Sequence, residues 1–261
     1  MDRMIEGDAF VLQPLWDWAR SLPYANHLLF PSLIALGSFH FHCWMFTLYD
    51  GLVLKRRGVA TMLWECALPQ TLAHAFLNTV SFMAFHAQRE LPEKAPSVND
   101  FVFGLLMCYF VGDFLIYWEH VFMHKNKWLR HYVHATHHKY TSPMFSFNAG
   151  WVHPLEILVA AICELFYPTV ASVHPLTLWV FLWTWIFWLT EEHSGDHVWF
   201  SLWNLSPLIG GGAPPHDLHH SPHLTKNFGF VFSCWDRLFG TFAEPSTETM
   251  VINEKQSKKD K

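Results

Sequence analysis

Residues 119–140 read EHVFMHKNKWLRHYVHATHHKY, and the histidines in this stretch recur at the spacing of helix turns. His120 and His124 are four residues apart, and His134, His137 and His138 fall at i, i+3 and i+4. On a helix, residues at these spacings project from one face. The stretch therefore predicts several imidazole rings that converge on one point.

The same two spacings return further along the chain. His193 and His197 repeat the first, and the HDLHH sequence at 216–220 repeats the second. Imidazole is the commonest protein ligand for transition metals such as iron and zinc. Ten ligands are too many for one ion, so the sequence predicts a site for two. The predicted ligands are His120, His124, His134, His137, His138, His193, His197, His216, His219 and His220.

A single HxxxH pair is explained equally well by histidines on the faces of amphipathic helices, but four clusters in one chain favour metal binding. Other residues beside these clusters are candidates for a supporting role. Carboxylates next to metal-bound histidines often hold the second ring nitrogen, although ordinary solvated charge is the equal alternative. These candidate neighbours are His153, His223, Asp217, Glu192 and Asp196.

The composition of the chain favours a bilayer over water. Of 261 residues, 51% are hydrophobic and only 15% are charged, with 14 Trp and 24 Phe. The net charge of −5 and the lack of a basic, aromatic-interleaved tract argue against nucleic acid as a partner. The five cysteines are scattered and never spaced as C-x-x-C, so we expect reduced thiols and no thiolate metal site.

The expected fold class is all-α, a multi-pass membrane helical bundle with a cytoplasmic helical cap that holds the histidine-rich dinuclear metal site. About 20 apolar residues cross a bilayer core, and apolar stretches of that length occupy 27–50, 61–85 and 101–120. The apolar run 155–189 is broken at Pro168 and at His174, which predicts a membrane hairpin.

The expected divisions of the chain follow from these spans. Residues 1–26 form an interfacial segment with Trp16 and Trp18 at headgroup level, and residues 27–118 form transmembrane helices. Residues 119–244 form a histidine-box catalytic region with the hairpin at about 155–190, and residues 245–261 form a cytoplasmic tail.

Basic residues set the expected orientation in the membrane. Lys55, Arg56 and Arg57 form the strongest basic loop, and such loops prefer the cytoplasm. This orientation places every histidine cluster on the cytoplasmic side. Lys258 and Lys259 stand at the third and fourth positions from the end, as in the dilysine signal that retrieves membrane proteins to the endoplasmic reticulum.

The chemistry expected of such a site depends on the metal. Zinc would support hydrolysis. Two irons beside an apolar pocket would suit oxygen activation and attack on an unactivated C–H bond, shielded from side reactions. The chain has neither a G-x-G-x-x-G stretch nor a haem-attachment C-x-x-C-H motif, so electrons must come from another protein. The sequence leaves open whether a purified sample carries zinc in place of iron.

Five motifs together resemble the fatty acid hydroxylase and sterol desaturase superfamily of membrane di-iron enzymes. They are EHVFMH at 119–124, HATHHK at 134–139, EEHSG at 191–195, HDLHHS at 216–221 and WDRLFGT at 235–241. LQPLWDWARS at 12–21 and HPLTLW at 174–179 are most similar to its cholesterol 25-hydroxylase branch. The resemblance implies insertion of one oxygen atom from O2 at carbon 25 of a membrane-embedded sterol, cholesterol. Electrons would come from NADPH through a separate reductase or small haem carrier.

Three departures from that branch bear on the substrate. HSGDH stands where HSGY is usual, SPHLTKNFG at 221–229 is one residue longer, and WVHP at 151–154 is closer to C4-methylsterol oxidases. A C4-methylsterol oxidase or another lipid hydroxylase is therefore the first alternative. A His-rich metal transporter and a non-catalytic sterol-binding membrane protein are alternatives from other classes. A transporter would need polar residues lining a path through its spans.

Overall fold

The computed structural model describes residues 2–49, 90–141, 144–195, 198–206, 208–221 and 225–245 of the chain. Within these ranges the protein is helical and has no strand, and one isolated β-bridge joins Gly210 to Phe232. The predicted all-α class is confirmed for this part of the chain. The expected basic loop at Lys55, the apolar stretch 61–85 and the lysine-rich tail lie outside the described residues.

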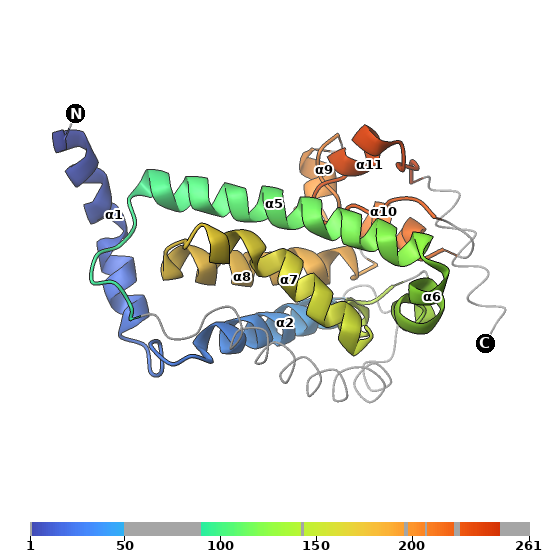
Figure 1. Cartoon of the computed structure of the whole chain (residues 1–261), viewed down its shortest axis with the longest axis horizontal. Helices are drawn as coiled ribbons and strands as arrows, with labels where there is room; N and C mark the ends of the chain where they lie inside the picture. Colours follow the sequence, from blue (N-terminus) through green and yellow to red (C-terminus); the bar gives the residue numbers. More distant parts are fainter. Residues whose placement is uncertain are drawn as a thin grey trace.

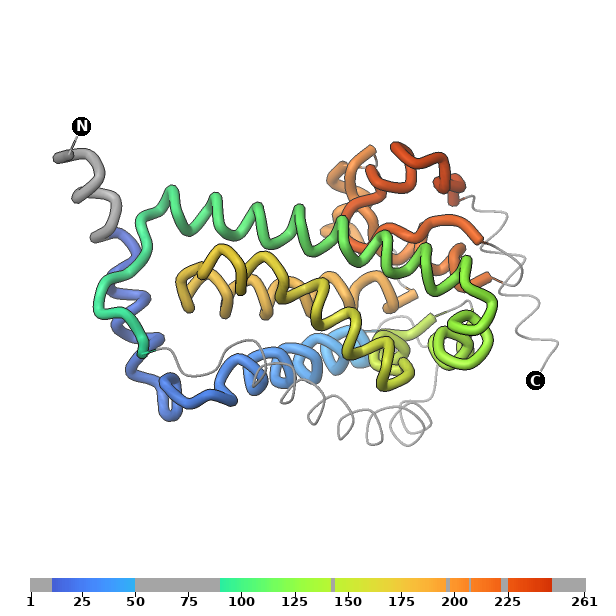
Figure 2. Tube along the Cα trace, in the orientation of Figure 1, coloured from blue at the N-terminus to red at the C-terminus, as the bar shows by residue number. Residues whose placement is uncertain are grey.

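Four long helices run lengthwise through the molecule (Figure 1). They are α2 (Phe30–Leu48), α5 (Val98–Lys125), α7 (Pro154–Val170) and α8 (Pro175–Glu192). Helix α1 (Asp2–Arg20) lies across the end of the bundle at which α5 begins, as the blue and green tubes of Figure 2 show. Short helices gather towards the opposite end: α6 (Lys127–Leu129), η3 (Arg130–His134), η4 (His137–Lys139), η5 (Ser146–Gly150), α9 (Leu202–Leu205), α10 (Ala213–His219) and α11 (Cys234–Phe239).

Local sequence explains where the long helices begin. Ser97 caps α5, because its Oγ accepts a hydrogen bond from the Asp100 N–H at 3.0 Å. Helices α7 and α8 each begin with the sequence His-Pro-Leu. In both, the histidine Nδ1 accepts the N–H two residues on at 3.1 Å, and proline takes the first helical position.

The predicted break at Pro168 is wrong. Helix α7 runs through this residue and ends at Val170. A proline in the last turn removes only one hydrogen bond of a helix that is about to end, so the disruption is small. The turn at His174 is where the sequence predicted it.

The two helices of the expected hairpin are present, but they do not pack as a closed pair. Helix α8 packs along α2, whereas α7 packs along α5. Among the described residues, α5 is the helix that is long and apolar enough to cross a membrane. Its 28 residues would extend about 42 Å at 1.5 Å per residue.

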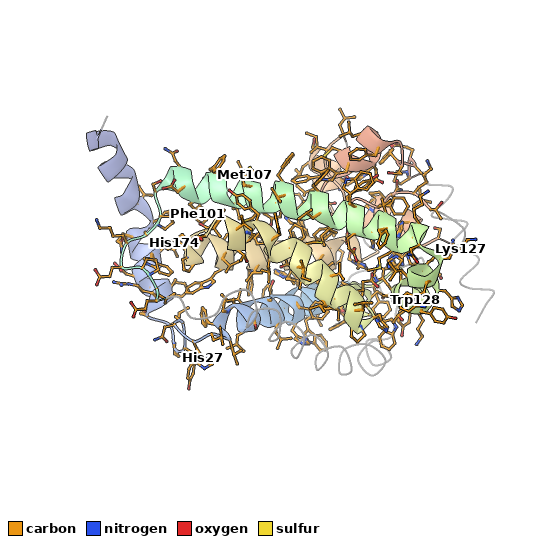
Figure 3. All side chains as sticks on the ribbon, viewed as in Figure 1. His27, Phe101, Met107, Lys127, Trp128 and His174 are labelled. Carbon is orange, nitrogen blue, oxygen red and sulfur yellow. The ribbon has the colours of Figure 1, made fainter. Side chains whose placement is uncertain are left out.

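Trp16 faces the interior of the protein and does not present its ring at the molecular surface. Trp16 is fully buried, its indole N–H donates to the Pro92 carbonyl at 2.8 Å, and its ring meets His174 edge-on. Trp18, by contrast, is 60% exposed. Figure 3 labels His174 and Phe101 at the α1 end of the bundle, and Lys127 and Trp128 at the other. Trp16 therefore fastens α1 to the bundle.

Asp113 joins α5 to the C-terminal part of the chain. Its fully buried carboxylate accepts hydrogen bonds from the N–H groups of Val231 (2.7 Å) and Phe232 (3.1 Å) and from the indole of Trp235 (2.8 Å). Bonds to a carboxylate are stronger than bonds between neutral groups. This single side chain therefore positions the segment that follows the last histidine box.

Replacing Asp113 with alanine should destabilise the protein, because two buried donors and one partly buried donor lose their acceptor. We expect the melting temperature to fall by about 10 °C, from about 1 kcal/mol or more per unsatisfied donor and about 2–4 °C per kcal/mol. Thermal unfolding of the purified protein in detergent measures this. Asp100→Ala, which removes an exposed carboxylate from the same helix, is the matched control. An equal shift in both variants would contradict the role of Asp113.

Candidate metal centre

The structure brings nine of the ten predicted histidines into two groups. Each histidine offers one ring nitrogen, and within each group these nitrogens lie within 4.8 Å of one another. The five-histidine group comprises His120, His124, His134, His138 and His219, and the four-histidine group comprises His137, His193, His216 and His220. The tenth predicted ligand, His197, lies outside the described residues, as do Asp196 and His223.

Each HxxHH box contributes to both groups. His134 and His138, four residues apart, belong to the five-histidine group, and His137 between them belongs to the other. In the HDLHH box the assignment is reversed. His216 and His220 belong to the four-histidine group, and His219 belongs to the five-histidine group. The groups are consequently neighbours, with the His138 and His220 rings stacked at 4.4 Å between centroids.

Distances between Nε2 atoms fit ligands that share one ion. Among His124, His134, His138 and His219 of the five-histidine group, neighbouring Nε2 atoms are 2.8 Å (His124 to His134) to 3.2 Å (His138 to His219) apart. In the four-histidine group the distances run from 3.0 Å (His193 to His216) to 3.5 Å (His137 to His193). Two ligands at right angles, each about 2.1 Å from a metal, would be about 3.0 Å apart. The donor atoms therefore suit two metal ions.

The hydrogen-bond partners of the Nδ1 atoms determine the tautomers of five of these histidines. Carbonyl and carboxylate oxygens only accept hydrogen bonds, so an Nδ1 that faces one must carry the proton, and its Nε2 is left with a free lone pair. Five histidines have such an acceptor: His120 (Phe228 O, 3.1 Å), His134 (Glu156 Oε1, 2.7 Å), His193 (Leu189 O, 2.8 Å), His219 (Lys226 O, 2.7 Å) and His220 (Tyr140 O, 3.2 Å). The Nε2 lone pair of each of these five histidines is therefore available to bind a cation.

Burial keeps these rings neutral. It lowers the pKa of His193 to about 3, and together with the neighbouring rings it lowers the pKa of His138 to about 2. For His220, burial and the rings of His137 and His138 also hold the pKa well below its usual value. A neutral imidazole is the form that binds a metal. The site is therefore in its ligating form at neutral pH.

Two carboxylates stand behind the rings. Glu192, one of the predicted neighbours, has its oxygens 3.4 Å from His193 Nδ1 and 3.7 Å from His216 Nδ1. Glu156 bonds His134 directly and was missed by the sequence analysis, because it is 22 residues away and follows no ligand spacing. Of the other predicted neighbours, Asp217 accepts the Met144 N–H at 2.9 Å, and His153 caps α7 outside both groups.

Glu156→Ala should weaken metal binding by the five-histidine group about 10–100-fold, as loss of such supporting partners generally does. The His134 Nδ1–H would lose its buried acceptor, and the ring would no longer be held in one orientation. Glu156→Gln keeps a neutral acceptor and should lose less. Competition with a chelator of known affinity measures both variants. Cys163→Ala, on the same helix, is the control, and unchanged affinity in Glu156→Ala would refute the role.

The segment that holds the outer side of the five-histidine group depends on Asp236. Its carboxylate accepts the N–H groups of Phe228 (2.8 Å) and Gly229 (2.6 Å) and the hydroxyl of Thr241 (2.7 Å). Phe228 in turn accepts from His120 through its carbonyl. The WDRLFGT motif therefore shapes the loop that orients a histidine, rather than supplying a ligand.

A glycine immediately before helix α10 allows the helix to pack close to its neighbours. Gly212 precedes it with φ of +122°, a conformation that side-chain-bearing residues rarely adopt. A Cβ at this position would lie 2.7 Å from Ser201 Oγ and 2.9 Å from Glu191 Oε2. The absence of a side chain here lets α10, which carries His216 and His219, approach the end of α8.

A cavity opens between the helices beside the histidines. Both groups line it, with His120 and His134 from one and His137, His193 and His216 from the other. Most of the remaining wall is apolar and comes from all four long helices, which explains why α7 and α8 are not packed together. The apolar wall residues include Ala35, Leu36, Phe39, Ile116, Ile157, Ala160, Ala161, Trp185, Ile186, Leu189 and Phe230.

Comparison with known proteins identifies the family. Residues 105–241 match the model of the fatty acid hydroxylase family. The chain belongs to this family. A very-long-chain aldehyde decarbonylase of Oryza sativa subsp. indica is 33% identical over 206 residues, which cover 75% of this chain and 74% of that protein. The family match spans all the histidines of both groups and the cavity wall formed by α7 and α8.

Two further relatives are named for sterols. A cholesterol 25-hydroxylase-like protein of Danio rerio is 29% identical over 259 residues, covering 89% of this chain and 98% of that protein. A putative methylsterol monooxygenase of Dictyostelium discoideum is 36% identical over 184 residues, which cover 70% of this chain and 66% of that protein. No solved structure matches the chain significantly. Membership of this family of hydroxylases assigns the chain an oxygenase-type function in lipid metabolism.

Proposed function

We propose that the protein is an O2-dependent di-iron sterol hydroxylase that oxidises the cholesterol side chain at carbon 25. The observation that carries the proposal is the cavity onto which both histidine groups face. Iron bound there would supply the activation of O2. One turnover converts R–H, O2, two electrons and two protons into R–OH and water, and the electrons come from NADPH through a separate reductase or haem carrier.

The chain's own residues would perform three tasks in this reaction. The nine histidines would hold the two ions, with the tautomers set by the carbonyls and carboxylates behind them. The apolar wall would bind the hydrocarbon and exclude water from the reacting carbon. Glu156 and Glu192 would keep the ligating rings oriented.

The proposed setting is the endoplasmic reticulum membrane, with several spans and the metal site on the cytoplasmic side. Apolar side chains on the outside of α5 support this, among them Phe103 (63% exposed) and Leu106 (62% exposed). Lys125, Lys127 and Arg130 follow at the end of α5 that carries the histidines, where the positive-inside rule favours cytoplasm.

A C4-methylsterol oxidase is the second candidate. It is favoured by the relative named as a methylsterol monooxygenase and by the WVHP sequence at 151–154, which begins α7. The metal site would be the same and only the position of the sterol in the cavity would differ.

Mass spectrometry of sterols from cells that express the wild type or His137→Ala tests the proposal. A side-chain hydroxysterol formed only with wild type is the expected result. An oxidised C4-methyl sterol would support the second candidate. Metal uptake into vesicles without sterol turnover would support a transporter, and metal-independent sterol binding without turnover a binding protein.

A further inference from the structure

Glu164 presents to the cavity a carboxyl group that has no hydrogen-bond partner among the described residues. The residue lies on α7, is partly exposed and lines the cavity. No hydrogen bond from another described residue reaches its carboxyl group, and the nearby Tyr109 hydroxyl donates to Thr184 Oγ1 at 2.6 Å.

Three helices place Glu164 at the end of the cavity away from the histidines. Glu164 follows Glu156, the partner of His134, by eight residues on α7. On α5, Gly112 precedes His120 by eight residues, and a Cβ there would lie 3.9 Å from Glu164 Cα. At 1.5 Å per residue, each stretch separates this level from the histidines by about 12 Å.

Helix α8 gives the same result. Trp185 precedes His193 by eight residues and lies 3.4 Å from the Cβ position of Gly112. Glu164, Gly112 and Trp185 thus form one level of the bundle, and the metal ligands form another. Between them the cavity wall is formed by apolar residues such as Ile116, Ala160 and Ile186.

An unpartnered carboxyl group in such a wall is costly to bury and is generally retained for a function. A carboxylic acid can both donate and accept a hydrogen bond, and a carboxylate can accept one. A hydroxyl group on a lipid satisfies either form. A purely apolar ligand would instead leave the carboxyl group desolvated and unpaired.

We propose that Glu164 binds the hydroxyl group of the lipid substrate and thereby fixes which carbon reaches the histidines. This inference rests on the proposed function. In a sterol, the hydroxyl group and the end of the side chain lie at opposite ends of the molecule. Binding the hydroxyl at Glu164 places the side chain at the metal site, whereas a C4-methyl group, next to the hydroxyl-bearing carbon, stays near Glu164. Glu164 is thus a specificity residue for side-chain oxidation.

Equilibrium binding of radiolabelled cholesterol and of its analogue without the hydroxyl group tests the inference, using the full-length protein in nanodiscs. Wild type should bind cholesterol at least tenfold more tightly than the analogue. Glu164→Leu should bind both equally, and Glu164→Gln, which keeps a donor and an acceptor, should preserve a preference. Cys163→Ala, one residue earlier and outside the cavity wall, should behave as wild type.

Sterol binding is measured separately from sterol turnover. Failure of the Glu164 inference can therefore be distinguished from failure of the proposed function. If wild type oxidises sterol but binds both ligands equally, or if Glu164→Leu keeps the preference, the inference is wrong and the proposed function stands. If wild type neither binds nor oxidises cholesterol, both are wrong. Metal content equal to that of wild type shows that the Leu variant is folded.

Discussion

His137→Ala and His219→Ala should each abolish turnover, and each should lose metal from one group only. His137 belongs to the four-histidine group and His219 to the five-histidine group. Removing one imidazole leaves an incomplete set of ligands and a buried gap beside the remaining rings. We expect activity to fall by more than the roughly 10–100-fold that loss of a supporting partner costs. Elemental analysis of the purified variants, alongside sterol turnover, measures both effects.

His131→Ala is the matched control, since His131 is exposed, lies next to the same boxes and belongs to neither group. It should retain metal and activity. Full metal content with full turnover in both His137→Ala and His219→Ala would exclude the two groups as the catalytic metal site. Loss of both ions from each variant would instead mean that the groups bind metal cooperatively.

Helical spacing predicted which histidines would meet, but not how they divide. Pairs four residues apart, such as His120 and His124 or His216 and His220, share a group, as expected for one helix face. The i+3 residues, His137 and His219, each join the opposite group. That division depends on how α10 faces the segment 130–139, which is a tertiary contact that spacing along one helix does not encode.

The groups that orient the rings were the hardest to predict. Backbone carbonyls at Phe228 and Lys226 carry no side-chain signal, because every residue has a carbonyl. Glu156 is recognisable only once α7 is packed along α5. The burial of Trp16 was not predictable for a related reason, since an amphipathic pattern does not distinguish a membrane surface from the side of a helical bundle. Local signals therefore predicted the helices and the ligands, while long-range contacts decided their surroundings.

Removal of metal should loosen one end of the molecule and leave the rest folded. The histidines come from α5, the segment 130–139, the end of α8 and α10, so two bound ions would link four parts of the chain. Helix α10 has seven residues and η4 has three. Helices this short are not stable on their own in water.

Hydrogen exchange with mass spectrometry, before and after chelation, measures this loosening. Backbone amides in 130–139 and 213–220 should lose protection, because their positions depend on the ions, while α2 serves as the internal control and stays protected. Added Fe²⁺ should restore protection, whereas Mg²⁺, which prefers oxygen ligands, should not. Unchanged exchange at α10 after confirmed metal loss would show that packing alone holds the histidines in place, and that metal binding serves chemistry without contributing to the fold.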